Sequence, residues 1–270
     1  MAVSIFALEG GVTRLLGESR SLSEASSTLP SGAYTSLRTY RGNRVLRIDQ
    51  HLARLEESVA LQGQPAKLDA EGVRSALRTA LAATGHPESR LRVTFAPPRV
   101  FVSVEPFEPL AESLYRDGVS CATFPFQREN PHSKDTRFIA TASGAYGSLP
   151  EGVHEGLLVA EDRSVLEGLS SNFFAVRRGA LYTEEDRVLL GVTRWLVLEV
   201  AAGLVPVEHR AILKPELAEA SEAFITSVSR EVLPVVAIDG LAIGGGRPGP
   251  QTRAIMAAFA DLVTKEAEPV

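Results

Sequence analysis

Short apolar stretches with period-two alternation recur along the chain and predict β-strands. In the first half these stretches are SIFAL, VTRLL, TSLRTY and RVLRI, followed by RLRVTFA and RVFVSVEPF on either side of Pro97-Pro98. In the second half we expect strands at 119–124, 156–160, 164–166, 172–176, 180–183, 205–208, 222–227 and 232–238. The Ser-rich residues 21–31 predict a loop.

Helical spacing of apolar residues is found in fewer places. Leu52, Leu55 and Val59 follow Asp49, a typical N-cap residue, and a second apolar stripe begins after Asp69. Further helices are expected at 109–116 and 136–146, from Trp195 to about 202, at 215–220, and along a final stripe of Ile255, Phe259, Leu262 and Val263.

The polar segment FQRENPHS contains Pro131 and interrupts this pattern, which predicts a domain boundary. We therefore expect an N-terminal α+β domain at 1–125, a linker at 126–133 and a C-terminal domain at 134–270. Strands and helices do not alternate regularly as in a doubly wound sheet, so the predicted fold class is α+β.

Composition excludes several classes of function. The chain has 270 residues and a net charge of −5, and its scattered charges include no basic block that would indicate nucleic-acid binding. A single cysteine and five well-separated histidines argue against a disulfide framework and against a metal site. No apolar run reaches 18 residues and the N-terminus lacks a basic region, so we expect a cytoplasmic protein with no membrane span.

One lysine stands out among the basic residues. Only four of the 28 basic residues are lysines, and Lys134 lies in the motif SKDTRFI before an apolar run. A positive charge at the start of a helix opposes the helix dipole, so the position is costly for an ordinary surface lysine. Unlike arginine, lysine can lose its proton and condense with a carbonyl group. Lys134 is therefore a candidate catalytic residue, with a solvated surface lysine as the alternative.

Three further segments contain candidate site residues. Glu167 in SVLEGLSSNFFAV ends an expected strand at a position where its neighbours predict burial, so its carboxylate needs a cationic partner. A hairpin turn explains the small residues that follow it but does not explain the carboxylate. Thr193 in LLGVTRWLVLEVA is a plausible N-cap of a helix whose first amides could bind phosphate. The segment FITSVSREVLPV is a strand that ends in small hydroxyl residues. Taken alone, the last two patterns are common in proteins.

Together and in this order, the motifs resemble those of the fold-type IV pyridoxal-phosphate (PLP) enzymes, which include branched-chain aminotransferases, D-amino-acid aminotransferases and aminodeoxychorismate lyase. The motifs that carry the resemblance are SLRTYRGNRVLRIDQHLARLEES, SKDTRFI, LEGLSSNFFAVRRGALYT, LLGVTRWLVLEVA and AFITSVSREVLPV. The resemblance extends from about residue 32 to 260. It implies a smaller N-terminal α/β domain and a larger, pseudo-barrel-like C-terminal domain that binds PLP.

The same resemblance implies a role for each matching residue. Lys134 would hold PLP as a Schiff base and move a proton at the substrate, and Glu167 would pair with the pyridine nitrogen and so gain its cationic partner. Arg54 would bind the 5′-phosphate, although without the resemblance it would be interpreted as a surface arginine. The remaining phosphate contacts would come from two segments, Val192–Thr193 and Ser227–Val228.

The sequence departs from the family pattern on the substrate side. Thr35 stands where many aminotransferases have glutamate and is closer to the lyases, whereas TFA at 94–96 lacks the substrate-carboxylate arginine of the D-amino-acid and lyase branches. Arg137 replaces the asparagine after the lysine. The candidates to contact the substrate are Tyr34, Arg92 and Arg137, and the alternative for the two arginines is a structural or exposed position.

The leading functional hypothesis is transamination between an amino acid, with branched-chain or other apolar amino acids first, and a 2-oxo acid. The alternative on the same fold is aminodeoxychorismate lyase, which eliminates pyruvate. A non-catalytic protein of this fold is a weaker alternative, because it would not need both Lys134 and Glu167. The resemblance also implies a homodimer.

Overall fold

Contacts among the residues divide the chain into two compact units in the computed structural model, which describes residues 2–270. Unit 1 contains the described residues up to Glu108, together with Ser133–Ser143 and Lys265–Val270. Unit 2 contains Pro109–His132 and Gly144–Thr264. No helix within residues 2–270 is long and apolar enough to cross a membrane.

This division differs from the boundaries expected at 125 and 134. The strand β7 (Val119–Pro125) lies in unit 2 because it pairs with two strands of that unit. Lys134 groups with unit 1 because its carbonyl accepts a hydrogen bond from the backbone N–H of Tyr34, at 2.9 Å. The predicted domain limits remain a prediction from the sequence.

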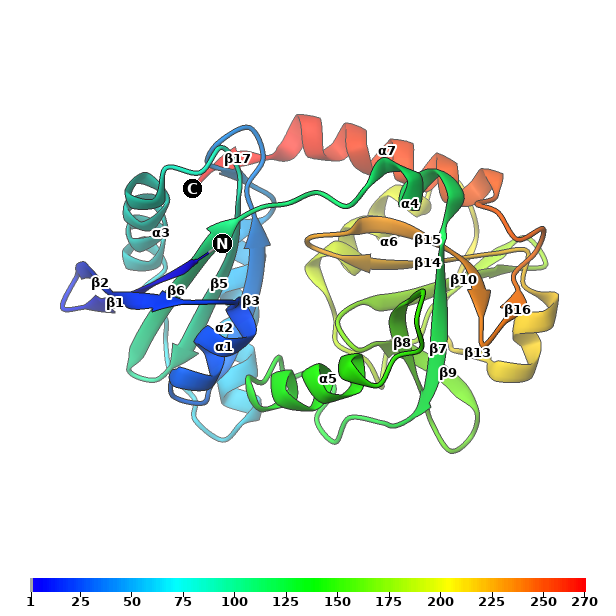
Figure 1. Cartoon of the computed structure of the whole chain (residues 1–270), viewed down its shortest axis with the longest axis horizontal. Helices are drawn as coiled ribbons and strands as arrows, with labels where there is room; N and C mark the ends of the chain where they lie inside the picture. The colour runs from blue at the N-terminus through cyan, green and yellow to red at the C-terminus, as the bar shows by residue number, and fades with distance from the viewer. Residues whose placement is uncertain (1) are drawn as a thin grey trace. The chain divides into compact units, whose positions relative to one another are not determined.

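Unit 1 is built on a five-stranded antiparallel sheet in the order β2-β1-β6-β5-β3. Its strands are β1 (Val3–Glu9), β2 (Val12–Ser19), β3 (Ala33–Arg38), β5 (Ser89–Ala96) and β6 (Arg99–Pro106) (Figure 1). The predicted hairpin is confirmed, because Pro97 and Pro98 connect β5 to β6. Alternation in β1 sends Phe6 into one apolar cluster and Val3 and Ile5 into another.

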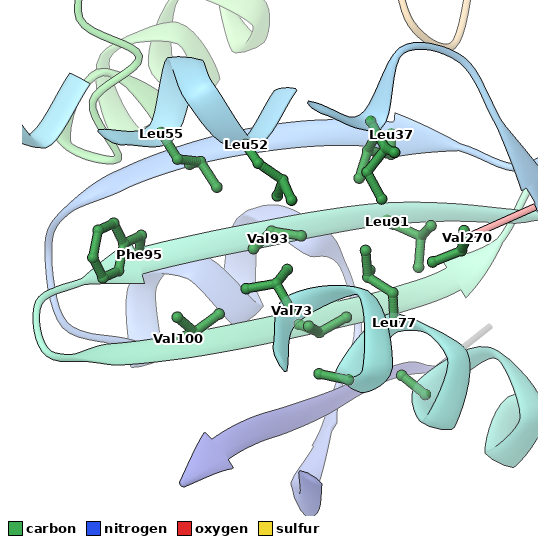
Figure 2. Close-up of a cluster of buried hydrophobic side chains, with 14 of the residues drawn as sticks. Leu37, Leu52, Leu55, Val73, Leu77, Leu91, Val93, Phe95, Val100 and Val270 are labelled. Carbon is green, nitrogen blue, oxygen red and sulfur yellow. The ribbon is translucent and has the colours of Figure 1, made fainter. Parts of the chain in front are cut away.

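The larger cluster of unit 1 lies between the sheet and the helices α2 (Ile48–Leu61) and α3 (Ala70–Thr84). Figure 2 shows the side chains that these elements contribute: Leu37, Leu91, Val93, Phe95 and Val100 from the strands, Leu52, Leu55, Val73 and Leu77 from the helices, and Val270. Asp69 caps α3 by accepting a hydrogen bond from Gly72 N–H, and Gly85 ends the helix with φ 63°, as the sequence predicts. Beside this cluster, β4 (Arg44–Val45) pairs with β17 (Glu268–Pro269).

Two local predictions for unit 1 are wrong. The expected Ser-rich loop contains the helix α1 (Leu22–Thr28), in which Ser21 is the N-cap and the apolar side chains pack on β1. The helix α2 begins one residue before Asp49, which was expected to cap it, and its N-cap is Arg47 in the left-handed conformation. Asp49 instead lies in the first turn, where it pairs with Arg74 at 2.6 Å. An aspartate is favourable both at the N-cap and in the first turn of a helix. The sequence pattern therefore predicted the helix but not the residue at which it begins.

Unit 2 contains a ten-stranded sheet, six strands of which close into a ring. The ring order is β10-β14-β15-β7-β8-β9, and β9 closes it by pairing with β10 at Glu167 and Asn172. These strands are β7, β8 (Val153–Val159), β9 (Ser164–Gly168), β10 (Asn172–Arg177), β14 (Glu222–Ser227) and β15 (Glu231–Ile238) (Figure 1). Inward-facing apolar residues of the strands fill such a closed barrel, and here they form a second core that includes Leu157, Phe173 and Ile225.

The remaining elements are short strands and helices. The short strands are β11 (Ala180–Tyr182), β12 (Val207–Glu208), β13 (Ile212–Leu213) and β16 (Leu241–Ala242). The helices are α4 (Glu112–Asp117), α5 (Arg137–Gly147), α6 (Val192–Ala201), the 3-10 helix η1 (Lys214–Glu219) and α7 (Pro250–Glu266). The residues of α5 and α7 are divided between the two units.

Candidate active site

Lys134 lies in an extended segment beside β3, three residues before α5 begins. Its backbone is held on both sides, because its N–H donates to Ser58 Oγ at 3.1 Å and its carbonyl accepts from Tyr34. The ammonium group, Nζ, is 4.7 Å from the centre of the Tyr34 ring. The sequence pattern placed Lys134 at a helix start; the structure instead fixes it against a strand, so that its side chain meets the ring of Tyr34.

Arg92 approaches the same aromatic ring from β5. Its guanidinium carbon is 4.8 Å from the centre of the Tyr34 ring, and its Nη1 donates to the carbonyl of Leu22 at 2.8 Å and to Ser26 Oγ at 2.5 Å. Burial lowers the pKa of Arg92. Its Nε atom is buried and has no hydrogen-bond partner among the described residues. Arg92 is therefore a half-buried cation that lies on the same aromatic ring as Lys134.

Arg137, the third substrate candidate, is not part of this group. Its side chain is 72% exposed and pairs with Asp135, to which Nε donates at 2.8 Å. Two of the three predicted substrate residues, Tyr34 and Arg92, thus lie together with Lys134, and the third points to solvent-exposed surface.

Arg54 is half-buried, although its spacing alone indicated a surface arginine. Its Nη2 donates to Thr35 Oγ1 at 2.8 Å, and the same hydroxyl shares a hydrogen bond of 2.7 Å with Nδ1 of His51. Burial lowers the pKa of Arg54 to about 10, so the group remains charged at neutral pH. Thr35, at the position where many aminotransferases have glutamate, therefore orients the guanidinium without neutralising it.

His51 gives this cluster a measurable pH dependence. Burial, and then the charges of Arg54 and Lys134, hold the pKa of His51 well below its ordinary value of 6.5. Below about pH 6.5 the unfolded chain binds a proton that the folded chain does not, so the free energy of unfolding falls as the pH falls. Below pH 6 we expect the free energy of unfolding to fall by up to about 1.4 kcal/mol for each pH unit. Urea unfolding at pH 5, 6 and 7 measures it, and an equal pH dependence in His51→Asn would contradict the assignment.

In unit 2, Glu167 is 4% exposed at the closure of the barrel. Its Oε1 lies 3.3 Å from Nη1 of Arg128, and its Oε2 accepts from the N–H of Leu189 at 3.0 Å and from Nδ2 of Asn172 at 3.4 Å. The predicted burial is confirmed, and the cationic partner that the carboxylate requires is present in the chain itself as Arg128. An ionised carboxylate accepts about four hydrogen bonds, and these donors hold it in one orientation inside the barrel closure.

The side chain of Asn172, which donates to Glu167, also makes two contacts with the residues just before α6. Asn172 Nδ2 also donates to the carbonyl of Leu189 at 2.7 Å, and Asn172 Oδ1 lies so close to Gly191 that an added Cβ would approach it to 2.4 Å. A side chain at Gly191 would therefore push the helix start away from Asn172. Two motifs that are about 20 residues apart in the sequence are joined here.

The helix start itself corrects two predictions. The helix α6 begins at Val192, three residues before the expected Trp195, and its N-cap is Gly191, which provides no capping side chain. Thr193 is thus a first-turn residue and not the N-cap. The first amides of a helix have no intrahelical acceptor, so the N–H groups of Val192 and Thr193 remain available to an anion.

Ser227 and Val228 lie at the turn between β14 and β15. The Ser227 hydroxyl accepts hydrogen bonds from the backbone N–H of Arg230 at 3.3 Å and from its Nε at 3.2 Å. Next to it, Thr226 Oγ1 is buried and has no hydrogen-bond partner in residues 2–270. This turn therefore has an unused polar atom and a hydroxyl fixed by a neighbouring arginine.

Sequence reasoning missed four charged or titratable residues of these clusters: His51, Arg128, Glu155 and Arg230. Arg128 lies in the expected linker, and the sequence contains no signal that it pairs with Glu167. Glu155 is a carboxylate inside the apolar strand VHEGLLV, and that conflict with the pattern was a usable signal of a buried ion pair.

Comparisons with known proteins agree with these motifs. The chain is 28% identical to the branched-chain-amino-acid aminotransferase of Pseudomonas aeruginosa over 88% of this chain and 85% of that protein. It is 29% identical to the D-alanine aminotransferase of Bacillus licheniformis over 87% and 88% of the two chains. The crystal structure of the branched-chain aminotransferase from Thermoproteus uzoniensis with norvaline superposes with a TM-score of 0.81, at 25% identity, over 99% of this chain and 97% of that chain.

The predicted fold class is confirmed by this likeness, with an N-terminal sheet and a C-terminal pseudo-barrel. The family model for class IV aminotransferases matches residues 32–238, which is most of the chain. On that evidence the chain belongs to the class IV aminotransferases, a family of PLP-dependent enzymes.

Proposed function

We propose that this enzyme transfers an amino group between an apolar amino acid, with branched-chain amino acids first, and a 2-oxo acid. The observation that carries the proposal is the grouping of Lys134, Tyr34 and Arg92 in unit 1. It combines an amine, an aromatic surface and a half-buried guanidinium, which are the groups needed to react with an amino acid and bind its carboxylate. The likeness to the Pseudomonas branched-chain enzyme supports the choice of substrate.

The donor set fits the cofactor. PLP needs an amine for its aldehyde, an anion partner for its ring nitrogen, and donors for its phosphate. Lys134 would supply the amine, the carboxylate of Glu167 would be the anion partner of the ring nitrogen, and Arg54 is a half-buried cation suited to phosphate. The amides of Val192–Thr193 and the turn at Ser227–Val228, with the unused hydroxyl of its neighbour Thr226, would add phosphate contacts.

When bound, PLP supplies an electron sink for the bonds at the substrate Cα. The chain's own groups would do the rest. Lys134 Nζ would move the proton between the substrate Cα and the cofactor C4′. Arg92 would attract the substrate carboxylate through its guanidinium charge, and the ring of Tyr34 would contact the apolar substrate side chain.

A panel of amino donors tests the substrate class. We expect L-leucine, L-isoleucine and L-valine to pass their amino groups to 2-oxoglutarate with kcat/KM at least about tenfold above that of polar amino acids, because each buried methylene contributes about 0.8 kcal/mol. D-alanine belongs in the panel, since the Bacillus relative is a D-alanine aminotransferase. A preference for D-alanine would contradict the branched-chain assignment but not transamination.

The lyase alternative has a separate readout. Incubation with aminodeoxychorismate should release no pyruvate if the enzyme is a transaminase, and pyruvate release without amino-group exchange would contradict the proposal.

We also propose a homodimer, as the family resemblance implies, with twice the 28.9 kDa mass of the chain in light scattering. The expectation of a cytoplasmic enzyme remains a prediction.

A further inference from the structure

Glu155, in β8 of unit 2, is a buried carboxylate that none of the proposed steps uses. It is 0% exposed, and five groups contact it as donors, one of which is Ser170 Oγ, 3.4 Å from Oε2. Oε1 accepts from Tyr146 OH at 2.6 Å and from the N–H of Gly156 at 3.0 Å. Oε2 accepts from Ser171 Oγ at 2.9 Å and lies 2.9 Å from Nη2 of Arg230. The carboxylate is thus fully coordinated within the protein.

Arg230 connects two turns of the barrel. It belongs to the turn between β14 and β15, where its Nε and its backbone N–H both donate to Ser227 Oγ. Its Nη2 donates to the hydroxyl and, at 3.4 Å, to the carbonyl of Ser170, which lies in the turn between β9 and β10. The guanidinium therefore holds the β14–β15 turn against the β9–β10 turn, with Glu155 as its counterion.

Residues of the proposed cofactor site lie in or beside both turns. The β9–β10 turn is flanked by Glu167 and Asn172, and the β14–β15 turn contains Ser227 and Val228. Glu155 also packs directly on this first turn, because a Cβ added at Gly168, the neighbour of Glu167, would lie 3.0 Å from the Glu155 carboxyl carbon. A change in the position of this ion pair would thus move the backbone of both the β9–β10 turn and the β14–β15 turn.

A buried ion pair stabilises a fold no better than a well-packed apolar pair, so stability alone does not explain its presence. What an ion pair with many hydrogen bonds adds is one fixed arrangement of the segments that it joins. That property is useful where two turns must contact the same ligand with little error.

We propose that Glu155 and Arg230 are positioning residues for the cofactor. Their ion pair sets the distance between the turn at Ser227–Val228, which would bind the phosphate, and the backbone beside Glu167, which would meet the pyridine ring. Neither residue touches the cofactor in this arrangement. The inference rests on the proposed cofactor contacts of these two turns.

The test uses a double variant, Glu155→Gln with Arg230→Gln, and measures its dissociation constant for PLP and the visible absorption band of the bound cofactor. Removing both charges avoids an unpaired buried charge, which could unfold the protein if only one partner changed. We expect the dissociation constant to rise about 10- to 100-fold, the range in which loss of outer supporting contacts weakens metal sites. Arg230→Lys, which keeps the charge, should bind PLP more tightly than the double variant.

A matched control is available in the same unit. Arg177 is 8% exposed on its side chain, and its Nη2 pairs with Glu219 at 2.8 Å, away from both turns. The double variant Arg177→Gln with Glu219→Gln should keep the dissociation constant and the absorption band of the wild type. An equal loss in both double variants would show a merely structural role and overturn the inference.

The outcomes separate this inference from the proposed function. If the wild type binds PLP and the Glu155/Arg230 double variant binds it with the same constant and spectrum, the positioning role alone is overturned. If the wild type binds no PLP, the proposed function fails and the positioning role fails with it.

Discussion

Replacing Lys134 with alanine is expected to lower kcat by at least about 10⁴-fold, the upper range of what one acid–base group contributes. Alanine has neither an amine to hold the cofactor nor a base to move the proton, whereas the fold should persist because the backbone contacts of residue 134 remain. Single-turnover and steady-state rates with the best amino donor measure the loss.

The chain offers a matched control for this variant. Lys67 is an exposed lysine that pairs with Glu56 at 2.8 Å, so Lys67→Ala should keep the wild-type kcat. Circular dichroism of both variants should match the wild type. A folded Lys134→Ala enzyme with turnover near that of the wild type would contradict the role of Lys134.

Replacing Glu167 is expected to change both stability and kcat, because its carboxylate pairs with Arg128 and would also contact the cofactor ring. Glu167→Ala leaves the buried guanidinium of Arg128 without this counterion, and breaking a buried pair in this way costs about 3–5 kcal/mol of unfolding free energy. Glu167→Gln keeps an acceptor for the N–H of Leu189 and should cost less stability. Without the negative charge beside the ring nitrogen, its kcat should still fall about 10²- to 10³-fold.

These two effects are measured separately, by urea unfolding and by kcat at saturating substrate. Glu219 is the control carboxylate, since it also pairs with arginines but is half exposed, and Glu219→Gln should change both quantities little. A Glu167→Gln enzyme with wild-type kcat would contradict the cofactor role, and unchanged stability of Glu167→Ala would contradict the ion pair with Arg128.

The sequence predicted the fold class and most strands, because hydrophobic periodicity and turn residues are local properties. The role of Lys134 rests on the family resemblance and stays a prediction. The same local signals failed at helix starts. Both α1 and α6 begin where a short amphipathic segment follows a small or polar residue, and Ser21 and Gly191 are weak signals on their own.

The charged partners could not be predicted because they depend on contacts between distant segments. Arg128 meets Glu167 across 39 residues, and Arg230 meets Glu155 only because β8, β9, β14 and β15 belong to one closed ring of strands. Likewise, Arg54 donates to Thr35 because α2 and β3 are neighbouring elements, a helix and a strand that the pattern could not place together.

Locating the cofactor on the chain tests directly whether Lys134 holds PLP. Purified enzyme incubated with PLP is reduced with borohydride, digested and examined by mass spectrometry, and only four lysines, Lys67, Lys134, Lys214 and Lys265, can carry the label. We expect a phosphopyridoxyl group on the peptide that contains Lys134 and on no other lysine peptide. Label on another lysine with Lys134 unmodified, or no label on any peptide, would contradict it.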